Sequence, residues 1–311
     1  MRDHDGLRIW IALLMTTVLI CCTGCPPPRQ VLEPVVDDVP MDKVIARVNR
    51  NVSEMDFLLK ASPLTATGKV RHPATERFES FDTNGTLYFQ KPRCLLARLS
   101  HPLAGSIELG SNDAEFWYWE KVDKPRYIYG MHEEAETAEA EELPLRPDYL
   151  VEILGLNELP VATSGPAGPL FEVRSERYVL TFLGRDAANR LYYTKSIFVD
   201  RRPPYLVRLI LYYDGEGHKL IQATLDDYKT IEGSSVLAPH RILIEQKKTS
   251  SHVELRFVRM QRSDNRKVEA YIERSPLDRG KVEWEWCRRV TRLRSDSSWP
   301  ATFPAGEPAL R

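Results

Sequence analysis

The sequence has no excess of charge of either sign. Its 311 residues include 43 Lys and Arg against 44 Asp and Glu, which gives a formal net charge of −1. Nucleic-acid-binding domains usually present a basic face and have a high isoelectric point. The charge balance therefore argues against a nucleic-acid partner.

The chain also lacks the motifs that carry most enzyme chemistry. It has no H-E-x-x-H, G-x-S-x-G, phosphate-loop or G-x-G-x-x-G pattern. The segment Asp214-Gly-Glu-Gly-His218 offers two acids and a histidine, but its glycines favour a hairpin turn. Asp226 and Asp227 are adjacent, so on a strand they would face opposite ways. We expect a protein that is not an enzyme and that has no catalytic residue, metal site or cofactor.

Cysteine is scarce, and three of the five cysteines lie at the end of one apolar run. Residues 9–20 carry no charge, but a helix that spans a bilayer needs about 20 apolar residues. The run fits the apolar core of a secretory signal peptide. The next residues, Cys22-Thr-Gly-Cys25, resemble a bacterial lipobox, with Cys22 where Leu is common. We predict a signal peptide over 1–24 and lipidation of Cys25; an ordinary signal peptide and an uncleaved anchor are the alternatives.

The segment that follows the lipobox predicts a tether on a membrane surface. Residues 25–40 are rich in proline and form a weakly structured linker. An acylated Cys25 would hold the chain on a membrane, because each buried CH₂ of an acyl chain contributes about 0.8 kcal/mol.

The two other cysteines of the mature chain are Cys94 and Cys287. An exported protein can form disulfides, so both a Cys94–Cys287 bridge and two free thiols are possible.

Two segments have the apolar spacing of helices. Apolar residues recur at helical spacing from Val44 to Leu59, and Pro63 stops the pattern, so we predict an amphipathic helix of about five turns over 41–61. Residues 147–156 predict a second short helix. Between them, 132–142 contain six Glu and no Lys or Arg, which is typical of a solvated loop or helix rather than a cation site.

Most of the remaining chain predicts an antiparallel meander of strands. Short turns separate them, including Asp82–Gly85 and Asp214–Gly217. Residues 268–272 are a candidate last strand, and 281–311 are predicted to be a partly disordered extension. The predicted strands cover 64–71, 85–90, 94–99, 106–109, 115–121, 126–129, 170–174, 178–183, 191–200, 206–213, 219–228, 240–246 and 251–260.

This order of helix, meander, helix and meander resembles the LolA/LolB-like superfamily of periplasmic lipoprotein carriers and receptors. The resemblance covers 41–280 and rests on five short stretches: Thr67-Gly-Lys-Val70, Gly85-Thr-Leu-Tyr-Phe-Gln-Lys-Pro92 with Arg98 and Pro102, the aromatic strand in 111–119, Leu237-Ala-Pro239, and 270–280, which is similar to the family's closing strand and turn. The resemblance implies an α+β fold in which one curled antiparallel sheet forms a half-barrel. Lid helices would cover its concave apolar face.

The concave face can be assigned from residues that alternate along the strands, because such a sheet is apolar on one side. In segment 115–121 both faces are apolar, and we place Trp117 and Trp119 inward. The predicted ligand-cavity residues are Leu87, Phe89, Ile107, Leu109, Trp117, Trp119, Val253, Leu255 and Phe257.

These features predict an envelope lipoprotein, anchored through Cys25 on the periplasmic face of the outer membrane. It would bind the acyl chains of a lipid or lipoprotein in the half-barrel. The alternative is an envelope sensor or protein-interaction module on the same fold, with the half-barrel filled by its helices and no transported ligand. A hydrolase of envelope polymer is a third hypothesis, which would need a polar cleft with clustered acids.

Overall fold

A computed structural model gives the fold of the part of the chain that follows the predicted tether. It describes residues 38–71, 77–101, 105–121, 126–132, 146–160, 169–185, 189–273, 289–292 and 302–303. The signal peptide, Cys25, tether residues 25–37, acidic residues 133–142, Cys287 and most of the predicted C-terminal extension lie outside these residues. Among the described residues, no helix is both long enough and apolar enough to span a bilayer.

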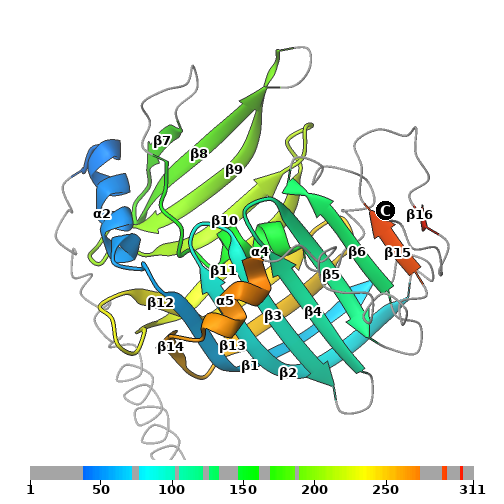
Figure 1. Cartoon of the computed structure of the whole chain (residues 1–311). Coiled ribbons are helices and arrows are strands. Elements are labelled where there is room, and N and C mark those ends of the chain that lie inside the picture. Colours follow the sequence, from blue (N-terminus) through cyan, green and yellow to red (C-terminus); the bar gives the residue numbers. More distant parts are fainter. Residues whose placement is uncertain are drawn as a thin grey trace, which may run out of the picture. The chain divides into compact units, whose positions relative to one another are not determined.

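One antiparallel sheet, which does not close into a barrel, forms the body of the described chain (Figure 1). Its first half contains β1 (Leu58–Arg71), β2 (Phe78–Gln90), β3 (Cys94–His101), β4 (Gly105–Ser111), β5 (Glu115–Lys121) and β6 (Arg126–Met131). Its second half contains β7 (Leu170–Val173), β8 (Arg177–Arg185), β9 (Leu191–Asp200), β10 (Val207–Tyr213), β11 (Lys219–Thr230), β12 (Leu237–Gln246), β13 (Ser251–Phe257) and β14 (Met260–Ser263). The predicted α+β fold with a curled meander is confirmed.

The two halves join where β1 pairs with β13, so that the order runs from β6 through β1 and β13 to β7. Leu64 lies opposite Phe257 and Lys69 opposite His252 in this pair. The sheet is thus held together by contacts between residues 183 to 193 positions apart. Two short C-terminal strands extend the sheet at its β6 end. β15 (Arg289–Arg292) pairs in parallel with β6, and β16 (Thr302–Phe303) pairs with β15.

The helix α2 (Met41–Ser53) is shorter than the sequence predicted. Its apolar stripe, Val44, Ile45, Val48 and Val52, is buried against the sheet. The prediction that the helix continues toward residue 61 is wrong, because Leu58 and Leu59 already belong to β1. Leu58 packs on one face of the sheet and Leu59 on the other, which is the pattern of a strand.

Two asparagines fasten α2 to distant backbone. Asn49 donates from Nδ2 to the carbonyl oxygen of Leu159 (2.9 Å) and accepts at Oδ1 from the Leu159 N–H (2.7 Å). Asn51 makes the same pair of bonds with Leu237, at 2.9 Å each. Each amide side chain therefore pairs with a backbone amide much as a neighbouring strand would.

The helix α4 (Pro147–Ile153) confirms the predicted helix at 147–156. It packs on the same face as α2, which we call the inner face, through Leu150, Val151 and Ile153. The turn after it uses Gly155, whose positive φ of 66° suits glycine.

The predicted strand at 268–272 is wrong, because these residues lie in the helix α5 (Arg266–Glu273). Ile272 is buried beside Leu58, Leu96 and Trp117 on the opposite, outer face of the sheet. Figure 1 shows α5 lying across β3. Val268 and Ile272 are four residues apart and so share one side of a helix, which the short segment could not distinguish from strand alternation.

The predicted turn at Asp82–Gly85 is also wrong. β2 continues through these residues and pairs with β1 from Phe78 to Phe89. Thr83 turns its hydroxyl to the carbonyl oxygen of Ala66, at 3.1 Å. Polar turn-forming residues are tolerated here because the long β1–β2 pair holds their backbone in the ladder.

Candidate functional site

Most of the predicted cavity residues share the inner face. Leu87, Phe89, Leu109, Val253, Leu255 and Phe257 are buried in one core cluster with α2 and α4, and Ile107 packs against it. At these positions the side chains pack in a core that also contains apolar residues of α2 and α4. Their role as ligand contacts stays a prediction.

The inward orientation predicted for Trp117 and Trp119 is wrong. Phe116 and Tyr118 face the inner cluster, whereas the two tryptophans belong to the outer cluster beneath α5. Trp117 donates from Nε1 to the buried carboxylate of Glu108, at 3.2 Å. A run of four aromatics has no polar side, so its alternation could not tell which face is inner.

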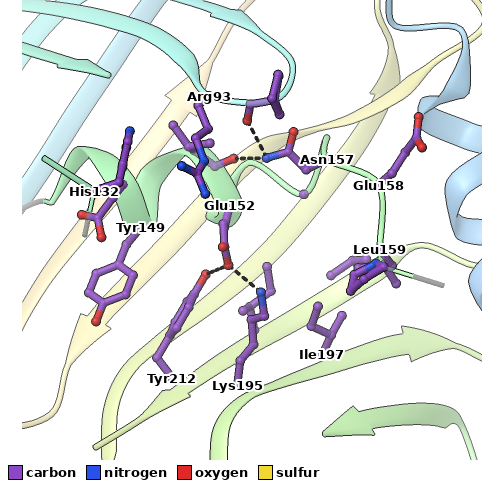
Figure 2. Close-up of a pocket in the computed structure, with 17 residues that line it drawn as sticks. Arg93, His132, Tyr149, Glu152, Asn157, Glu158, Leu159, Lys195, Ile197 and Tyr212 are labelled. Atoms are coloured by element: carbon purple, nitrogen blue, oxygen red, sulfur yellow. Dashed lines mark hydrogen bonds and ion pairs between the residues drawn. The ribbon is translucent and has the colours of Figure 1, made fainter. Parts of the chain in front are cut away.

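A pocket of about 460 Å³ opens on the inner face between α4, the segment after it and strands β9 and β10 (Figure 2). None of the nine predicted cavity residues lines it. Its volume lies within the range of about 300–1,000 Å³ that is usual for small-molecule sites. Its apolar lining is Pro92, Tyr149, Val151, Leu159, Pro160, Ile197, Val207, Ile210 and Tyr212, and its polar lining includes Arg93, His132, Asp148, Glu152, Asn157, Glu158 and Lys195.

Glu152 is the centre of a hydrogen-bonded cluster in this pocket (Figure 2). Its Oε2 accepts from Lys195 Nζ at 2.7 Å and from the hydroxyl of Tyr212 at 2.8 Å. Burial raises the pKa of Tyr212 well above its ordinary value, and the Glu152 carboxylate raises it further. Tyr212 therefore stays protonated and acts as a donor.

The start of α4 forms a second, neutral cluster. The Arg146 guanidinium binds both carboxylate oxygens of Asp148, at 3.1 and 2.6 Å, and lies 4.1 Å from the ring centroid of Tyr149. The Tyr149 ring is in turn 4.7 Å from that of Tyr212, between centroids. This stack joins α4 to β10 along one side of the pocket.

The segment after α4 forms another wall and is tied to two other elements. Asn157 donates to the carbonyl oxygen of Pro92 at 3.0 Å, in the turn between β2 and β3. Lys91 in that turn bonds both Glu158, at 3.1 Å, and the carbonyl oxygen of Val52, at 2.8 Å. Together with the Asn49–Leu159 pair, these bonds connect α2, the β2–β3 turn and the pocket wall.

His132 and Arg93 complete the polar lining. His132 places Nε2 2.8 Å from the carbonyl oxygen of Asn112, and its ring centroid lies 5.8 Å from that of Phe116. Arg93 belongs to the β2–β3 turn and is exposed. Figure 2 shows its side chain extending from that turn toward α4.

The predicted hairpin at Asp214–Gly217 is confirmed. Asp214 Oδ1 accepts from the backbone N–H groups of Glu216 and His218, at 2.9 and 2.8 Å, between β10 and β11. These backbone bonds, that of His218 first, lower the pKa of Asp214. The ligand atoms of Asp214, Glu216 and His218 lie within 4.8 Å of one another, but the local hydrogen bonds of the turn account for this grouping.

The Cys94 thiol is free, and Cys287 lies outside the described residues. Burial raises the pKa of Cys94 to about 11, and Asp113 and Glu273 contribute further. The thiolate is the reactive form of cysteine, so Cys94 is a poor nucleophile.

Sequence reasoning missed the pocket residues because no local pattern links them. Glu152, Lys195 and Tyr212 come from α4, β9 and β10. The one local signal is Glu152 itself, an acid inside the apolar run of residues 149–156.

No protein-family model matches the chain, and no curated protein matches it. Solved structures are similar to it at low sequence identity. A provisionally named outer membrane lipoprotein-sorting protein domain from Vibrio parahaemolyticus is 14% identical, with a TM-score of 0.47, covering 75% of this chain and 98% of that one. A LolA superfamily protein from Nitrosomonas europaea is 14% identical, with a TM-score of 0.42 and coverages of 73% and 95%.

A DUF1329 family protein from Desulfovibrio piger is 11% identical, with a TM-score of 0.46, covering 75% of this chain and 95% of that one. All three likenesses have TM-scores below 0.5.

Proposed function

We propose that this chain is a non-catalytic envelope lipoprotein that binds an acyl chain of a lipid or lipoprotein in the pocket between α4, β9 and β10. The observation that carries the proposal is the composition of this pocket. Val151, Ile197, Val207 and Ile210 supply an apolar lining, and charged side chains lie beside it. An apolar pocket with a few placed polar groups is the usual form of a small-molecule site.

The energy of acyl burial is sufficient for capture. Burying one CH₂ contributes about 0.8 kcal/mol, so ten methylenes contribute about 8 kcal/mol before the costs of binding. A free energy of that size corresponds to a dissociation constant of about 1 μM. A pocket of about 460 Å³ needs to shield only part of a long chain for this purpose.

The test is to fill the pocket. Ile210→Trp places an indole ring in it, whereas Leu209→Trp places the same ring on the outer face of β10. We expect the full chain, held in amphipol, to bind 11-(dansylamino)undecanoic acid saturably, and Ile210→Trp to lose this binding. Leu209→Trp should retain it.

Circular dichroism checks that both variants fold, and Val207→Phe replaces Ile210→Trp if that variant does not. Equal binding by the filled and unfilled pockets would overturn the proposal. Charged substitutions at Leu109 and Leu255, two of the predicted cavity residues, would not test the pocket. Both residues are only 1% exposed, so a charge at either position would disrupt the core.

One observation favours the alternative of a sensor or protein-interaction module. The inner face below α2 is filled by the helix and its neighbours, as the cluster around Val48 and Leu87 shows. A chain that binds no acyl probe but retains a stable envelope partner would fit this alternative.

A further inference from the structure

The charges that line the pocket are unequally compensated. Each of its three carboxylates has a cationic partner: Glu152 with Lys195 at 2.7 Å, Asp148 with Arg146 at 2.6 Å, and Glu158 with Lys91 at 3.1 Å. Lys195 is thereby also paired. Among the described residues that line the pocket, Arg93 is the cationic side chain left without an ion pair or hydrogen bond.

The position of Arg93 makes this charge available to a ligand. It follows Lys91 and Pro92 in the β2–β3 turn, and both neighbours are fixed by bonds to the pocket wall, Lys91 to Glu158 and the Pro92 carbonyl to Asn157. The backbone beneath Arg93 is therefore anchored, while its side chain extends toward α4 (Figure 2). A guanidinium offers a planar set of donors that matches a carboxylate or phosphate.

We propose that the ligand of this pocket is an anionic amphiphile, whose carboxylate or phosphate head binds Arg93 while its acyl chain lies on Val151, Ile197 and Ile210. This inference rests on the proposed function and narrows it to one class of lipid. Each of the three acids already has a cationic partner, so a cationic head would find no uncompensated carboxylate here. A neutral head would gain no ion pair from the Arg93 guanidinium.

The experiment compares two probes that differ only in head charge, 11-(dansylamino)undecanoic acid and its methyl ester. We expect the full chain in amphipol to bind the acid at least about tenfold more tightly, since only the acid offers the Arg93 guanidinium a charged acceptor. Arg93→Gln should remove this preference without weakening the binding of the ester. Arg93→Lys should restore part of it.

Arg266→Gln is the matched control, because it removes an exposed arginine at the start of α5, which packs on the outer face. It should leave both affinities unchanged. Dodecyl phosphate should displace the acid, whereas inorganic phosphate at the same concentration should not. Displacement by inorganic phosphate would identify a site for free anions and would overturn the proposal that the ligand is an amphiphile.

The outcomes separate the two proposals. If the wild-type chain binds acid and ester equally, or if Arg93→Gln still prefers the acid, the proposal of an anionic head is overturned. The proposal of acyl-chain binding is then unaffected. If the wild-type chain binds neither probe, the proposed function itself fails.

Discussion

Glu108 shows how single residues set the outer face of the sheet. Its carboxylate is buried and accepts from Trp117 Nε1 at 3.2 Å, Arg98 Nε at 3.1 Å and the Tyr271 hydroxyl at 2.9 Å. A buried charge is tolerated only when it is paired and hydrogen-bonded. The acid therefore fixes Trp117 on the outer face and ties α5 to β4 through Tyr271.

The first prediction concerns Gly110, which lies under the Trp117 ring. A Cβ added there would be 1.9 Å from Trp117 Cζ2, and the ring is fully buried and hydrogen-bonded. We expect Gly110→Ala to lower the free energy of unfolding by about 1–3 kcal/mol, the usual cost of overpacking a core. Urea denaturation followed by tryptophan fluorescence measures the change.

Gly215→Ala is the control for this prediction, since its Cβ would meet no atom within 4 Å in the β10–β11 turn. It should change the free energy of unfolding by less than about 0.5 kcal/mol. If both alanine variants were equally stable, Trp117 would not be packed on Gly110 as the structure shows.

At the scale of elements, the inner helices are held by polar side chains as well as by apolar packing. Asn49 and Asn51 lie two residues apart on α2, yet one binds the pocket wall at Leu159 and the other binds β12 at Leu237. The Asn49 bonds therefore link α2 directly to the pocket, which the Asn51 bonds do not. This arrangement allows the two attachments to be tested separately.

We predict that Asn49→Ala speeds amide hydrogen exchange in residues 155–160 and leaves residues 236–239 unchanged. Removing the side chain frees the N–H and carbonyl of Leu159, and each lost bond costs about 1 kcal/mol. Exchange at amides that open locally rises with the loss of local stability. Mass spectrometry of peptides from the full chain makes the measurement.

The matched variant is Asn51→Ala, which should show the reverse pattern, with faster exchange near Leu237 and an unchanged pocket wall. Identical exchange patterns in the two variants would mean that α2 is released as a whole. The pocket wall would then depend on the helix and not on the Asn49 bonds.

At the scale of the whole molecule, the proposed function requires the chain to lie at a membrane. The described fold begins at Asp38, and the predicted lipidation site lies 13 positions earlier in the sequence. The sequence predicts a weakly structured, proline-rich linker between the two.

We predict that Cys25→Ser abolishes incorporation of radiolabelled palmitate and releases the chain from the membrane fraction of a bacterial host, because the acyl chains provide the membrane affinity. Cys22→Leu is the control and should keep both properties, since Leu is the usual lipobox residue at that position. Labelling that survives Cys25→Ser would show that this cysteine is not the lipidation site.

The sequence by itself determined the features that depend on local periodicity. Alternating residues marked most of the strands, with β9 predicted at its observed bounds of 191–200, and the 3.6-residue spacing marked α2 from Met41 onward. Burial on one side of a sheet or helix imposes these periods on neighbouring residues. For the same reason Leu109 and Leu255 could be assigned to one face, although they lie far apart in the chain.

Only the tertiary structure decided the features that depend on contacts between distant residues. It placed Trp117 outward, because Gly110 leaves room for the ring and Glu108 accepts its N–H. It also brought Glu152, Lys195 and Tyr212 together and left Arg93 without a partner among the described residues of the same pocket. A side chain's partner across the fold depends on how the sheet curls and how the helices lie on it, and neither leaves a period in the local sequence.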